Sequence, residues 1–68
     1  MSFEAEKAEI RGSKSLSGVY SVLNRAGIDT SKPLAESLKD ARSAYQYPLC
    51  KLILVAQMRI NQIENKDL

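Results

Sequence analysis

The residue types that most often perform catalysis or bind metals are scarce in this sequence of 68 residues. It contains no histidine, the commonest general acid and base, and its single cysteine, Cys50, therefore has no histidine to activate it. One cysteine without histidine cannot build a zinc site, and it cannot form a disulfide within the chain. We therefore expect no metal and no cofactor.

Carboxylates are the remaining candidates for acid–base chemistry, and Glu36, Asp40 and Glu64 are the ones to consider. Each falls on the polar face of an expected helix, where charged side chains are normally solvated. The three glycines are isolated, so no glycine-rich phosphate-binding loop is present. A thiol near a helix N-terminus can be reactive, but we interpret Cys50 as a buried or half-buried structural residue. The sequence thus predicts a protein that is not an enzyme and has no small-molecule substrate.

The charges are nearly balanced and are dispersed along the chain. Ten Lys/Arg and eight Asp/Glu give a net charge of +2, and acidic residues are interleaved with most of the basic ones. Nucleic-acid-binding domains of this size usually carry a larger basic excess on one face. The longest apolar run, 52–56, is far too short to span a membrane, and the charged N-terminus does not resemble a signal peptide. We expect a single cytoplasmic domain over residues 1–68.

Such a small domain buries little surface, so it often needs a disulfide, a metal or a partner chain for stability. Because the chain can form no internal disulfide and no zinc site is expected, we expect the additional stability to come from a protein partner or from homo-oligomerisation.

The N-terminal segment predicts a weak helix over residues 2–11. Ser2 can cap it and Gly12 can end it. Only Phe3 and Ile10 share an apolar face, so we expect residues 1–12 to form either a docked arm or a frayed one.

Two stronger amphipathic helices follow, at about 15–26 and 33–46. Ser13 or Ser15 can cap the first, and Gly27 can end it in a left-handed residue, with Ile28 folding back on the helix. Pro33 suits the first position of the second helix. Apolar residues at helical spacing form one stripe on each helix. The stripes are Leu16, Val19, Tyr20, Leu23 and Ala26 in the first, and Leu34, Leu38, Ala41 and Tyr45 in the second.

The last helix, about 48–65, begins at Pro48. Inside a continuous helix this proline would remove a hydrogen bond to the Ala44 carbonyl and cost about 3 kcal/mol. Two helices with a break near Gln46 and Tyr47 are therefore favoured, with one kinked helix as the alternative. Alternating apolar residues also permit a strand, but the segment is long and the chain offers no second strand to pair with it.

The last helix carries more apolar residues than one stripe needs. An inner stripe consists of Leu49, Leu52, Ile53, Ala56, Ile60 and Ile63. Leu54, Val55 and Met58 fall outside it, with Lys51 at their border, and exposed Tyr47 at the break before Pro48 is a further candidate for partner contact. Exposed Leu and Met beside polar residues suit a contact surface for another chain. Alternatively, the N-terminal segment with Phe3 and Ile10 covers them within the monomer.

The sequence thus predicts a small all-α domain of three to four helices. We expect it to be a non-catalytic protein–protein interaction module, such as a small helical adaptor, co-chaperone, inhibitor or self-assembling subunit, acting through its last helix. The alternative is a small DNA-binding regulator, because "VYSVLNRAGIDTSKPLAESL" has a glycine-containing turn between two helices and "SVLNRAGID" resembles repressor headpieces. Pro33 and the acidic residues of the would-be recognition helix argue against that alternative.

Overall fold

The computed structural model describes residues 3–65 and contains four helices, with no strand in that range. The helices are α1 (Glu4–Gly12), α2 (Leu16–Arg25), α3 (Leu34–Ser43) and α4 (Tyr47–Glu64). The predicted small all-α fold is therefore confirmed. None of the described helices is long and apolar enough to cross a membrane.

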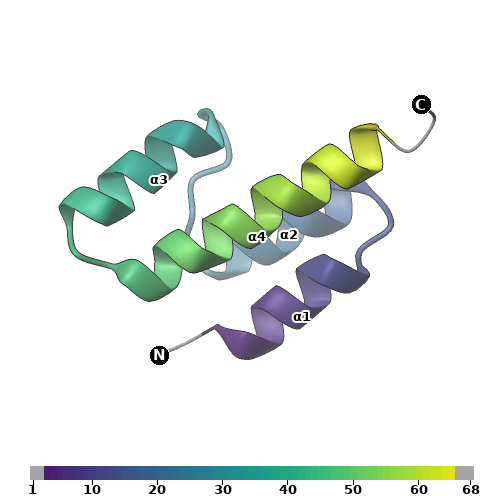
Figure 1. The fold of residues 1–68 in the computed structure, drawn as a ribbon, viewed down its shortest axis with the longest axis horizontal. Coiled ribbons are helices and arrows are strands. Elements are labelled where there is room, and N and C mark those ends of the chain that lie inside the picture. The colour runs from purple at the N-terminus through teal and green to yellow at the C-terminus, as the bar shows by residue number, and fades with distance from the viewer. Residues whose placement is uncertain (1–2, 66–68) are drawn as a thin grey trace.

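Helix α4 is the element on which the other three pack (Figure 1). In this view α2 lies behind α4, and α1 and α3 flank it on opposite sides. Helix α1 also contacts α2. The inner stripe of α4 is confirmed, because Leu52, Ile53 and Ala56 are completely buried and its other three members pack against the core. Buried residues from the other helices and from the α2–α3 connection complete the core: Ile10, Val19, Val22, Leu23, Ile28 and Ala41.

Helix α1 packs on both α4 and α2. Ile10 is completely buried, and Phe3 packs against the core. Lys7 is also buried, and its ammonium group lies 3.3 Å from a Glu4 carboxylate oxygen. A lysine can bury its aliphatic stem in this way while its charged end keeps a partner. The predicted cap Ser2 lies outside the described residues.

Helix α2 begins and ends as predicted. The Ser15 hydroxyl accepts a hydrogen bond from the Gly18 N–H at 3.3 Å, which makes Ser15 the cap. At the other end Gly27 has a φ of 90°, and the Ile28 N–H donates to the Leu23 carbonyl at 3.0 Å. These are the features of a Schellman stop, in which a left-handed residue allows the chain to turn back on the helix.

Helix α3 differs from the prediction at both ends. Pro33 precedes the helix instead of opening it, because its extended backbone (ψ 140°) makes Leu34 the first helical residue. At the other end, Tyr45 lies beyond the helix with a φ of 59°, and the Gln46 N–H donates to the Ala41 carbonyl at 2.9 Å. This is a second Schellman stop, with tyrosine at the position that usually holds glycine. The placement of Tyr45 on the buried stripe was therefore wrong, and Ser37 is buried on that face instead.

Pro48 is the second residue of α4, which confirms two helices and excludes both a continuous kinked helix and a strand. The N–H groups of the first helical turn have no partner within the helix, so proline loses nothing there. The turn of three residues between α3 and α4 sends the chain back, and the two helices lie side by side in opposite directions (Figure 1).

Candidate functional site

The largest group of exposed apolar side chains lies along α4 on the side opposite the inner stripe. We call Tyr47, Lys51, Leu54 and Met58 the outer stripe. Their spacing of four, three and four residues places them within an arc of about 60° on the helix. Tyr47 is 55% exposed, Leu54 44% and Met58 64%, and Lys51 is also exposed. The structure therefore brings four of the five predicted site residues together on one face.

The fifth predicted residue, Val55, lies at the edge of this face and packs partly against the core. It also lines a hollow with Arg11 of α1, so α1 borders this edge of α4. The N-terminal segment does not cover Leu54 or Met58, because Ile10 of α1 is buried in the core and Phe3, just before α1, packs against it. The alternative in which the N-terminal segment buries these two residues is therefore wrong.

Tyr45 belongs beside this surface although the sequence analysis placed it in the core. Its side chain is 77% exposed, and its ring centroid lies 6.4 Å from that of Tyr47 in an edge-to-face arrangement. The only sequence feature that could have indicated this exposure is the proximity of Pro48, which requires α3 to end a few residues earlier. The two rings form an aromatic pair at the turn between α3 and α4.

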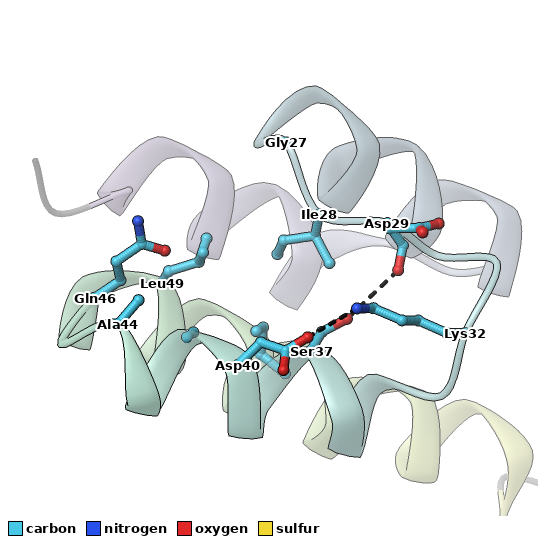
Figure 2. A pocket seen from close by; sticks show the side chains of 11 residues that line it. Gly27, Ile28, Asp29, Lys32, Ser37, Asp40, Ala44, Gln46 and Leu49 are labelled. Carbon is cyan, nitrogen blue, oxygen red and sulfur yellow. Dashed lines mark hydrogen bonds and ion pairs between the residues drawn. The ribbon is translucent and has the colours of Figure 1, made fainter.

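A second surface feature is a groove between α3 and the connection that follows α2 (Figure 2). Lys32 reaches across to Asp40, with 2.8 Å between the ammonium nitrogen and the carboxylate oxygen. This hydrogen bond and the charge of Asp40 raise the pKa of Lys32. The Ser37 hydroxyl donates to the Asp29 backbone carbonyl at 3.4 Å. These polar groups bond to one another, so the groove serves to hold the α2–α3 connection against α3.

Asp29 illustrates the structural role of that connection. Its carboxylate accepts hydrogen bonds from the Ser31 hydroxyl at 2.6 Å and from the Ser31 N–H at 2.9 Å. These two bonds lower the pKa of Asp29, with a smaller contribution from the charge of Lys32. A carboxylate whose charged form is stabilised in this way is a weak proton acceptor, which does not suit a general base.

The other residues considered for chemistry do not form a catalytic group: Glu36 and Asp40 are one helical turn apart on α3, Glu64 ends α4, and Cys50 lies near the start of α4. Glu36, Asp40 and Glu64 are exposed, and Cys50 is buried as predicted. Within residues 3–65, no three His, Cys, Asp or Glu side chains gather in a way that could hold a metal ion.

The arrangement of α2 and α3 bears on the DNA-binding alternative. In a helix-turn-helix unit the two helices pack together so that the second can enter the major groove. In the described part of the chain, α2 and α3 make no backbone contact with each other, and each packs on α4 instead. This geometry does not favour DNA recognition.

Comparison with protein-family models, with curated protein sequences and with solved structures gives no match to this chain.

Proposed function

We propose that this chain is a non-catalytic protein–protein interaction module that binds another chain through the outer stripe of α4. The observation that carries the proposal is the grouping of exposed apolar side chains. The exposed large hydrophobic residues of the described chain are Tyr45, Tyr47, Leu54 and Met58, and all of them lie on α4 or at the turn that leads into it.

The free energy that these exposed side chains would contribute if they were buried supports the proposal. Burying a large apolar side chain contributes about 1.5–3 kcal/mol, and small domains have little stability to spare. Leaving Leu54 and Met58 exposed forgoes part of that contribution in a chain of 68 residues. A partner that covers them restores it on binding.

The backbone of Tyr45 gives independent support. Its φ of 59° lies in the left-handed region, where a side chain other than glycine costs on the order of 1 kcal/mol. Glycine would satisfy the same turn without that cost. The turn therefore gains no stability from having tyrosine there, and the exposed ring is available to contact a partner. Tyrosine is among the residues most enriched at binding hot spots.

Three single variants test the proposal: Leu54→Lys, Met58→Lys and Ile53→Lys. The first two place a charge on an exposed part of α4, so circular dichroism should show an intact helical fold. Ile53 is completely buried, and the third variant should unfold the chain because it leaves a charge in the core. Sedimentation of each variant, alone and with proteins that co-purify with the native chain, should show that association is lost in the two folded variants.

The unfolded variant is the control for loss of binding through loss of structure. If Leu54→Lys and Met58→Lys remain folded and associate as the native chain does, the outer stripe is not the binding surface. If both unfold as completely as Ile53→Lys, these residues are part of the core and the proposal fails.

A further inference from the structure

The charge on the outer side of α4 has a single sign. Between Tyr47 and Ile63 the helix contains no acidic residue, whereas it carries Lys51 within the outer stripe and Arg59 toward α1. On the neighbouring helix, Arg11 joins Arg59 in lining the hollow beside Met58, together with Val55 and Gln62. The outer stripe is therefore an apolar surface with basic residues along the edge that faces α1.

The positive charge of Arg59 is held in place without being neutralised. Its Nε donates to the Ser13 backbone carbonyl at 2.8 Å, and Nη1 donates to Gln62 Oε1 at 3.1 Å. Both acceptors are neutral. The guanidinium group is therefore oriented by the fold and keeps its net charge for a partner, which lowers the entropy lost on binding.

Three carboxylates of α1 and α3 are paired with cations that lie outside this face. Glu4 pairs with Lys7, Glu9 pairs with Arg25 across α1 and α2, and Asp40 pairs with Lys32 beside α3. Within residues 3–65 no ion pair involves Lys51, Arg11 or Arg59. The described part of the chain thus leaves the charge of these three residues available to another molecule.

This pattern distinguishes between the possible occupants of the outer stripe. Two copies of the chain meeting through this face would bring Lys51, Arg11 and Arg59 of both copies together, and such like-charge contacts oppose association. An acidic partner gains from the same charges. The exposed stripe also repeats at four and three residues, the spacing through which one helix packs along another.

We propose that the partner presents an acidic amphipathic helix, which lies along α4 between α1 and α3 (Figure 1). Its apolar residues cover Tyr47, Leu54 and Met58, and its carboxylates contact Lys51, Arg11 and Arg59. This inference rests on the proposed function and adds the chemical class of the partner.

The test uses two synthetic helical peptides of about 20 residues, long enough to form a helix in water. One has leucines at heptad spacing flanked by glutamates, and the other replaces every glutamate with lysine. Each peptide is mixed with the full native chain at increasing concentrations. Fluorescence anisotropy of the labelled peptide gives the affinity, and NMR of the chain shows which residues the peptide contacts. The acidic peptide should bind, should shift the methyl signals of Leu54 and Met58, and should bind at least about tenfold more tightly than the basic one.

Two charge-reversal variants test whether the positive charge within the outer stripe is responsible for binding the acidic peptide. Lys51→Glu should weaken binding of the acidic peptide by about tenfold, because it converts an attraction into a repulsion within the interface. Lys39→Glu makes the same change of charge at an exposed position of α3 outside the outer stripe. It should change binding less than about twofold, because salt screens a solvent-exposed charge that the peptide does not contact. Circular dichroism checks that both variants remain folded.

Three results would overturn the inference, and they differ in what they leave of the proposed function. Equal binding of both peptides, or of neither, rejects an acidic helix as the partner. Sedimentation showing a dimer that Leu54→Lys abolishes would mean that the occupant is a second copy, and the proposed interaction function would stand. Binding through the stripe to phosphatidylglycerol vesicles, with no peptide bound, would indicate a membrane surface and would reject both proposals.

Discussion

Replacing Gly27 with alanine isolates the free-energy cost of one backbone conformation. Gly27 has a φ of 90°, and a Cβ built at this position would meet no atom within 4 Å. Steric clash with neighbouring residues is therefore absent, and the cost comes from the backbone alone. An alanine in the left-handed region is less favourable than glycine by about 1 kcal/mol. We expect Gly27→Ala to lower the free energy of unfolding by about that amount.

The same substitution at Gly12 is a matched control. Gly12 is the last residue of α1, and a Cβ there would also meet no atom within 4 Å. Its backbone is helical, so alanine should stabilise the chain by up to about 0.5–1 kcal/mol through lower entropy of the unfolded state. The two variants should therefore change stability in opposite directions, although both exchange hydrogen for a methyl group in open surroundings.

Thermal and urea denaturation followed by circular dichroism measure both variants. For a domain of this size, 1 kcal/mol corresponds to a shift of about 4–8 °C in the melting temperature. Gly27→Ala should melt lower than the native chain and Gly12→Ala at the same temperature or higher. A neutral or stabilising Gly27→Ala would refute the Schellman stop, since alanine would then occupy that position without strain.

Three further predictions concern the turns. Both Tyr45→Gly and Tyr45→Ala remove the ring, but only glycine relieves the strain of the left-handed backbone. Tyr45→Gly should therefore be more stable than Tyr45→Ala by about 1 kcal/mol in urea denaturation. A more stable Tyr45→Ala would exclude a left-handed residue there. Pro48→Ala should change stability by less than about 1 kcal/mol, because no helical hydrogen bond is restored; a larger gain in melting temperature would indicate a continuous helix. Asp29 should titrate below its ordinary pKa of 3.8 by NMR, and Ser31→Ala should move that pKa upward by removing the hydroxyl donor. Because the folded pKa is lowered, the stabilisation from Asp29 is present above pH 3.8 and is lost as the pH falls through the folded value; an unchanged Asp29 pKa in Ser31→Ala would contradict this reasoning.

The helices and several of their boundaries could be predicted from the sequence because their causes are local. Apolar residues at helical spacing indicate which face is buried, and this identified Leu52, Ile53 and Ala56 correctly. Gly27 and Pro48 marked a stop and a start because their backbone restrictions do not depend on the rest of the fold.

The end of α3 could not be predicted in the same way. Helical spacing continued through Tyr45 and placed it on the buried stripe, whereas the structure turns it outward in a left-handed conformation. Tyrosine carries no local preference for that conformation. The turn that sends the chain from α3 back along it as α4 requires the left-handed conformation at Tyr45.

The sequence by itself determined the all-α class, the inner stripe of α4 and the presence of surplus apolar residues on that helix. Only the tertiary structure decided that Leu54 and Met58 are exposed, because their burial depends on where α1 packs. It also decided that Arg11 lies beside Met58, which joins residues distant in the chain into one basic edge. Periodicity reports which face of a helix is apolar, but which neighbour covers that face depends on contacts between helices far apart in sequence.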